Sequence, residues 1–157
     1  MGPIAKWLAS AALAGCLVVM WNARHSAAQQ RTRVIMTRLY TGPDGLSYAE
    51  DVEMKVLPTA AASPTAVPTE SAETVKVTGV QFRRQAPGYV NDWHTAPRRQ
   101  YVITLNGRSE VELSGGQKVL YVPGKVVLAE DLTGKGHITR VIGTEDYISV
   151  TIPLANK

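Results

Sequence analysis

Two histidines in the chain after residue 28 are the side chains best suited to chemistry near neutral pH. His94 follows Asp92-Trp93, and His137 closes a glycine-containing loop 43 residues later. An imidazole titrates at about pH 6.5, so it can bind a metal ion, contact a ligand or carry a proton. We take both histidines as candidate site residues. The alternative is that they are hydrogen-bonded groups that hold the mouth of the fold together.

Two pairs of adjacent arginines, Arg83-Arg84 and Arg98-Arg99, are further candidates. Adjacent residues of a strand point to opposite faces, so one arginine of each pair is expected to face inward. An inward guanidinium can bind a carboxylate or phosphate through two parallel hydrogen bonds, and we expect Arg98 to do so. The alternative is an internal ion pair with an acidic residue such as Asp92, Glu110 or Glu112.

Two aromatic residues lie close to His94 in the sequence. Trp93 and Tyr101 are candidates for the apolar wall of a ligand pocket beside the histidine. The alternative for both is packing in the core or at its rim, which is the commoner use of a large aromatic side chain.

The spacing around both histidines resembles the two motifs of the cupin family. The first motif runs Gly, five residues, His-x-His, three or four residues, Glu, six residues, Gly, and this spacing is kept by Gly88, His94, Gln100 and Gly107. In the second motif Pro and Gly open a strand and a His follows about a dozen residues later, as in Pro123, Gly124 and His137. More narrowly, the stretches 92–100 and 128–137 resemble small, uncharacterised single-domain bacterial cupins.

The resemblance covers about residues 75–154 and implies a cupin barrel with a metal site. The family's metal ligands are three His and one Glu; His94 and His137 match two of them, whereas Ala96 and Gln100 replace the others. Two imidazoles and a neutral amide supply no negative charge, so they make a weak site for Fe, Mn, Ni, Cu or Zn. The expected cofactor is therefore none or a weakly bound divalent metal. Its ligands would be His94, Gln100 and His137, with Glu130 or Asp131 as a further carboxylate.

The rest of the sequence predicts strands that would position these residues. Short alternating stretches are separated by turn residues about 8 to 12 positions apart, a spacing typical of a sandwich or barrel. Asn106-Gly107 predicts a hairpin between strands 101–105 and 109–113, because both residues tolerate positive φ. No stretch after residue 28 shows helical amphipathicity. We therefore predict an all-β protein, a single-domain cupin of the double-stranded β-helix or jelly-roll kind.

Four segments are predicted along the chain. Residues 1–28 are a signal peptide, and residues 29–57 are an N-terminal extension with edge strands. Residues 58–73 are rich in Pro, Ala, Ser and Thr and predict a linker or long loop, and residues 74–157 are the cupin barrel.

The first segment predicts export to the periplasm or the outside of the cell. Lys6 ends a short positive start, residues 7–21 form an uncharged apolar run, and Ser26-Ala27-Ala28 fits a cleavage site. The run is shorter than the about 20 residues that a membrane span needs, so no span is expected in the mature chain. The alternative is lipidation at Cys16, the only cysteine, which follows Leu13-Ala14-Gly15.

Composition limits the classes of function. The chain has 157 residues, 45% of them hydrophobic and 19% charged, which is typical of a globular domain and excludes wholesale disorder. The net charge of +4 falls to +2 without Lys6 and Arg24 of the leader. Such a small excess does not indicate a nucleic-acid partner.

These observations lead to three hypotheses. The first is an exported protein that binds a small molecule, an anion being one candidate, in a barrel cavity lined by His94, Arg98, Gln100 and His137. The second is a metal-dependent oxygenase or isomerase, so that enzymatic activity is left open. The third is a structural module without a ligand that pairs with a second copy as a homodimer through its sheet edges.

Overall fold

The computed structural model describes residues 32–60, 63, 65–67 and 69–155. The predicted signal peptide and the alternative lipid anchor at Cys16 lie outside the described residues. Every regular element within the described part of the chain is a β-strand. None of these residues belongs to a helix with the length and hydropathy needed to cross a membrane.

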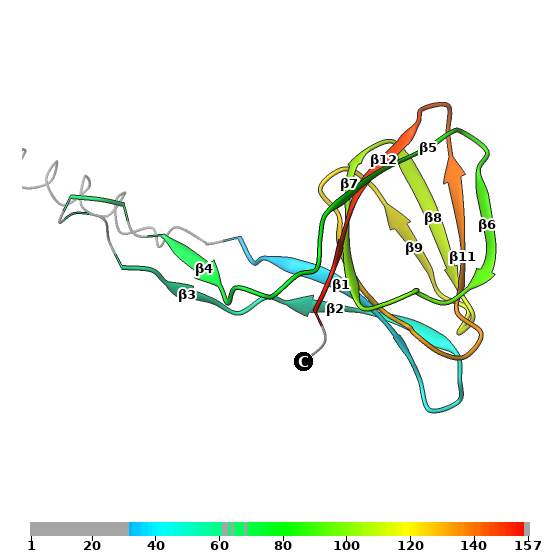
Figure 1. The fold of residues 1–157 in the computed structure, drawn as a ribbon, viewed down its shortest axis with the longest axis horizontal. Helices are drawn as coiled ribbons and strands as arrows, with labels where there is room; N and C mark the ends of the chain where they lie inside the picture. Colours follow the sequence, from blue (N-terminus) through cyan, green and yellow to red (C-terminus); the bar gives the residue numbers. More distant parts are fainter. Residues whose placement is uncertain (1–31, 61–62, 64, 68, 156–157) are drawn as a thin grey trace, which may run out of the picture. The chain divides into compact units, whose positions relative to one another are not determined.

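Two sheets face each other and enclose the core (Figure 1). The larger sheet has six strands in the spatial order β2 (Ser47–Glu53), β1 (Ile35–Thr41), β10 (Val126–Glu130), β7 (Gln100–Asn106), β12 (Tyr147–Pro153) and β5 (Gln81–Gln85). The smaller sheet has four, in the order β6 (Val90–His94), β11 (His137–Ile142), β8 (Arg108–Leu113) and β9 (Lys118–Tyr121). The core cluster draws buried side chains from both sheets, among them Leu39, Val111, Leu113, Val127 and Val141. The predicted all-β fold class is confirmed: the described residues form a barrel of two facing β-sheets.

The N-terminal extension contributes strands to the larger sheet. β1 pairs antiparallel with β2 along its whole length and parallel with β10, where Thr37 lies opposite Val127. β2 is the edge strand on this side, and β1 connects it to the barrel. The fully buried Leu39 shows that β1 supplies part of the core.

The segment predicted as a linker or loop has paired ends. β3 (Val56–Pro58) and β4 (Glu70–Ala72) form a two-stranded sheet of their own, and the loop expected over 58–73 is confined to the residues between them. This pairing could not be predicted from apolar periodicity, because most residues of the two strands are exposed.

The hairpin predicted at Asn106-Gly107 is wrong. β7 and β8 follow each other at this point but belong to different sheets, so the chain turns a corner of the barrel. Gly107 has φ 70°, and a Cβ there would lie 2.5 Å from the carbonyl oxygen of Asp146. The glycine is therefore required by the close approach of two backbones as well as by its dihedral angle. A local turn preference does not determine which strands pair.

Candidate functional site

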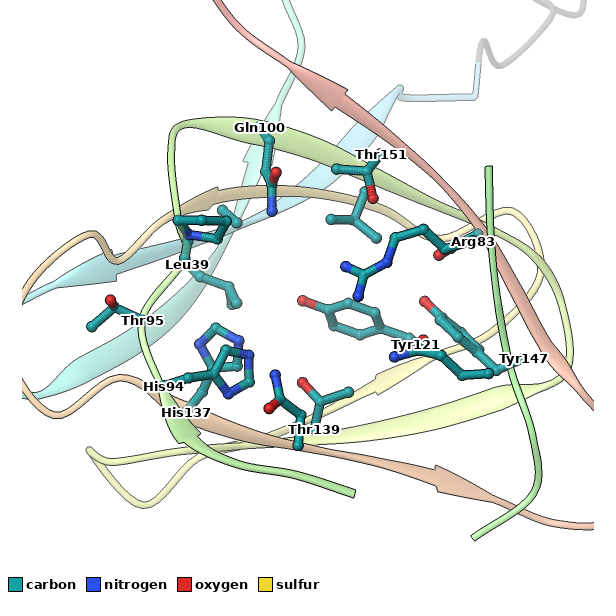
Figure 2. Close-up of a pocket in the computed structure, with 17 residues that line it drawn as sticks. Leu39, Arg83, His94, Thr95, Gln100, Tyr121, His137, Thr139, Tyr147 and Thr151 are labelled. Atoms are coloured by element: carbon teal, nitrogen blue, oxygen red, sulfur yellow. The ribbon is translucent and has the colours of Figure 1, made fainter. Parts of the chain in front are cut away.

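The two sheets enclose a cavity of about 300 Å³ at one end of the barrel (Figure 2). Its polar lining comes from six strands and the turn after β6. These residues are Arg83, Gln85, Asn91, His94, Thr95, Gln100, Tyr121, His137, Thr139, Tyr147, Ser149 and Thr151. Three of the sequence-predicted site residues, His94, Gln100 and His137, are among them.

Strand pairing brings the two histidines together. His94 ends β6 and lies opposite His137, the first residue of β11, and their ring centroids are 4.3 Å apart. His94 Nδ1 donates a hydrogen bond to the backbone carbonyl of Asp92 at 2.7 Å, which leaves Nε2 as the nitrogen without a proton. Burial lowers the pKa of His94, and the nearby His137 lowers it further, although the Asp92 carbonyl opposes both. His94 is therefore held as a neutral imidazole.

His137 has a carboxylate behind it. Its Nδ1 lies 2.6 Å from Asp131 Oδ2, which also accepts a hydrogen bond from the Ser47 hydroxyl at 3.1 Å. Asp131 is 0% exposed, and its other oxygen, Oδ1, has no hydrogen-bond partner. The contact between Nδ1 and Asp131 Oδ2 fixes the proton of a neutral His137 on Nδ1, so Nε2 carries the lone pair. We call His137 and Asp131 the cavity pair.

A tight turn delivers His137 to this position. Gly134 and Gly136 both have positive φ, and a Cβ on Gly136 would lie 2.0 Å from the backbone oxygen of His94. The turn therefore packs directly against the end of β6, which explains how residues 43 positions apart meet.

Arg83 is the charged residue that lines the cavity, whereas the sequence interpretation favoured Arg98 for this position. The prediction that one arginine of an adjacent pair faces inward is correct for Arg83 of β5, whose guanidinium points into the cavity (Figure 2). Arg84 faces away and lies 3.7 Å from Asp146. Among the described residues, no acidic side chain lines the cavity, and none forms an ion pair with Arg83. The cavity therefore carries a positive charge without an acidic partner among the described residues, on an arginine that is itself exposed to solvent.

Two tyrosines form part of the wall beside Arg83. Burial raises the pKa of Tyr121 well above its ordinary value, and burial also raises that of Tyr147. The Tyr147 hydroxyl lies 3.0 Å from the hydroxyl of Thr104. Both phenols therefore stay protonated and can donate hydrogen bonds.

Three sequence-predicted residues lie outside this cavity. Arg98 is exposed in the bend after β6 and lines a neighbouring hollow of about 350 Å³, which shares Arg83 and Gln100 with the cavity. Trp93 is 39% exposed, and Lys135 Nζ lies 4.3 Å from its ring centroid. Tyr101 is half-buried and is not part of the cavity wall. Alternation could not orient Arg98, because residues 97–99 are not in a strand.

The carboxylates proposed as extra metal ligands have other partners. Glu130 accepts hydrogen bonds from Arg38 Nε at 2.6 Å and from Arg99 Nε, and Arg38 also binds Glu50 at 2.9 Å. Burial raises the pKa of Glu130, but the hydrogen bonds from Arg38 and Arg99 outweigh this, and the net pKa is lowered. We call these four residues the ion-pair cluster.

The described residues do not fit a cupin-type metal centre. Within the described part of the chain, no group of three or more His, Cys, Asp or Glu side chains is placed to hold a metal ion. Ala96 and Gln100 stand where the cupin resemblance implies a second His and a Glu, Glu130 binds two arginines, and Asp131 binds His137. Two imidazole nitrogens and an amide remain, and such a set lacks the anionic donors that would hold a divalent ion firmly.

Comparison with known proteins adds a structural similarity. No protein-family model and no curated protein matches the chain. Among solved structures, it is similar to a cupin domain from Bordetella pertussis Tohama I, with 16% sequence identity and a TM-score of 0.41 over 66% of this chain and 96% of that one. The functional interpretation therefore rests on the geometry of the cavity.

Proposed function

We propose that this chain is an exported protein that binds a small anionic molecule in its barrel cavity. The observation that carries the proposal is Arg83, whose guanidinium points into a cavity of about 300 Å³ without an acidic partner among the described residues. A guanidinium that has no acidic partner is available to a ligand, and it binds carboxylates and phosphates through two parallel hydrogen bonds.

The remaining polar wall suits an anion of limited size. Gln100 supplies an amide and Tyr121 a phenolic hydroxyl on the cavity side (Figure 2). Apolar contact comes from Leu39 and Val102. The volume lies at the lower end of the range of ligand cavities, about 300–1,000 Å³, so a small organic acid fits better than an oligomer. Export is supported by the signal-peptide pattern of residues 1–28.

The test compares two adjacent arginines. Protein purified from cells that express the full chain would be titrated calorimetrically with phosphate and with a panel of small mono- and dicarboxylates. We expect at least one carboxylate to bind, and Arg83→Met to weaken that binding tenfold or more. Arg84→Met is the matched control, since Arg84 faces Asp146 outside the cavity, and it should leave the affinity within about twofold.

Two results would contradict the proposal. One is binding of every panel member with affinity too low to measure; the other is equal affinity in the Arg83→Met and Arg84→Met variants. Elemental analysis of the same preparation tests the metal-dependent alternative: stoichiometric metal that disappears in His94→Ala would favour that reading over ours.

A further inference from the structure

The cavity pair is more elaborate than ligand binding requires. Asp131 is fully buried, and only one of its two oxygens is hydrogen-bonded. Burying a carboxylate with an unsatisfied oxygen is costly, and a neutral acceptor could hold His137 at a lower cost. His94 is held by such a neutral acceptor, because its Nδ1 donates a hydrogen bond to the backbone carbonyl of Asp92.

A buried carboxylate orients an imidazole and stabilises its protonated form more strongly than a neutral backbone carbonyl does. It orients the ring, fixes the proton on Nδ1 and stabilises the imidazolium that forms when Nε2 accepts a second proton. His137 contributes to the cavity wall, and Figure 2 shows its ring and the Arg83 guanidinium on opposite sides of the cavity. A ligand anchored on Arg83 would therefore extend toward Nε2 of His137.

We propose that the cavity transfers a proton on small carboxylic acids that carry a carbonyl group, with His137 as the base and Asp131 as its positioning residue. The inference rests on the proposed anion site, because Arg83 is the group that binds the substrate carboxylate. The class of substrate follows from four lining residues: Arg83 for the carboxylate, Gln100 and Tyr121 as donors to a carbonyl oxygen, and His137 for the adjacent carbon.

The proposed step needs no cofactor. Nε2 of His137 takes a proton from the carbon next to the carbonyl; the C–H bond breaks, an N–H bond forms, and the electron pair moves onto the carbonyl oxygen as an enolate. Amide and phenol donors in the wall stabilise that oxygen. The imidazolium then returns a proton to the same carbon or to another atom, so that the net result is isotope exchange or isomerisation.

Proton exchange in D₂O tests this step directly. Pyruvate and 2-oxobutyrate would be incubated with the full chain, and loss of the C3 proton signals would be followed by NMR. We expect exchange above the buffer rate, a fall to that rate in His137→Gln, and a fall of at least tenfold in Asp131→Asn. In Asp131→Asn, the affinity for the probe should stay within about threefold, because Asp131 does not face the cavity.

A matched control and a spectroscopic readout separate positioning from general structural damage. Asp92→Asn makes the same chemical change beside the other histidine, where Asp92 binds the ring through its backbone carbonyl and not its side chain, and it should leave the exchange rate unchanged. ¹⁵N NMR of the wild-type chain should show His137 protonated on Nδ1, and Asp131→Asn should shift this tautomer balance. If Asp131→Asn does not fold, His137→Gln and the wild-type tautomer decide the question.

The outcomes distinguish this inference from the proposed function. Probes that bind through Arg83 but exchange no faster than in His137→Gln would overturn the inference and leave the binding function intact. An undiminished rate in Asp131→Asn would remove the role of Asp131. If neither probe binds while other anions do, the substrate class is wrong; if no anion binds, the proposed function fails as well.

Discussion

Glu130 and Asp131 are neighbours in the sequence and have opposite surroundings. Glu130 ends β10 and is bound by two arginines in the ion-pair cluster, which consists of Arg38, Glu50, Arg99 and Glu130. Asp131 lies behind His137 with one oxygen unpartnered, and no lysine or arginine of the described residues pairs with it. In the cluster, charges are matched and hydrogen-bonded, which is the arrangement expected of a group that only stabilises.

The arginines show the same contrast. Arg99 is neutralised by Glu130, whereas Arg83 projects into an acid-free cavity. Both arginines are at the larger sheet: Arg83 lies on β5 and is exposed, and Arg99 directly precedes β7 and is half-buried. In this barrel, therefore, a charged side chain without an oppositely charged partner is a better indicator of a functional site than a charged side chain as such. Three substitutions test whether the cavity and the ion-pair cluster differ in this way.

The largest loss of stability is expected from Gly136→Ala, which would displace the turn beside the cavity. A Cβ there meets the His94 backbone oxygen at 2.0 Å, so the turn that carries His137 must move. We expect unfolding by urea to show a loss of about 3 kcal/mol or more. Gly116→Ala is the control, because Gly116 also has positive φ but has open space around it, and its cost should be about 1 kcal/mol. Equal costs would show that the close approach is unimportant.

A smaller effect is expected from Glu130→Gln in the ion-pair cluster. The change removes the negative charge and replaces one of the two acceptor oxygens with an NH₂ group, so Arg38 or Arg99 loses its acceptor on residue 130, at a cost of about 1–3 kcal/mol at pH 7. The pKa of Glu130 is lowered in the folded state from its ordinary 4.5, so its contribution is present above pH 4.5 and is lost as the pH falls through the lowered pKa. The difference in unfolding free energy between wild type and Glu130→Gln should therefore shrink in acid. A difference that stays constant from pH 7 to pH 3 would argue against the assignment.

The smallest effect, and the most direct test of the comparison, is expected from Arg83→Met. Since Arg83 has no acidic partner in the described part of the chain, its loss should change the unfolding free energy by no more than about 0.5 kcal/mol. Arg99→Met should cost about 1–2 kcal/mol, because it removes a charged hydrogen bond to Glu130. Both would be measured by urea unfolding without added anions. A large loss for Arg83→Met would mean that Arg83 has a structural role.

Three of the cavity residues could be predicted from the sequence. The others could not, because the direction in which a side chain points depends on the tertiary structure. His94, Gln100 and His137 were singled out by their resemblance to the cupin motif positions, and all three line the cavity. Arg98 was preferred over Arg83 because strand alternation was applied to residues that form a bend. A signal for Arg83 existed: Gln81, Arg83 and Gln85 share one face of β5, and Phe82 on the other face is 73% exposed. A polar face turned inward is typical of a cavity wall and not of a packed core.

The last strand carried the same signal. Ser149 and Thr151 are buried and line the cavity, while Ile148 and Ile152 on the other face are only half-buried. Alternation gave the two faces correctly, but apolar residues are usually assigned to the interior. Here the enclosed face is the polar one, because it surrounds a cavity.

The all-β class and most turns could be predicted from the sequence alone, since strand propensity and turn chemistry are local properties. The two histidines could be singled out by their motif positions. Tertiary structure decided which face of each strand is enclosed, which strands pair across Gly107, and which of two adjacent carboxylates meets arginines and which meets His137. These outcomes depend on groups distant in the chain, as when Arg38 reaches Glu130 or Ser47 reaches Asp131. The chemistry proposed for the cavity arises from those long-range contacts, because they determine which charges are neutralised and which remain available to a ligand.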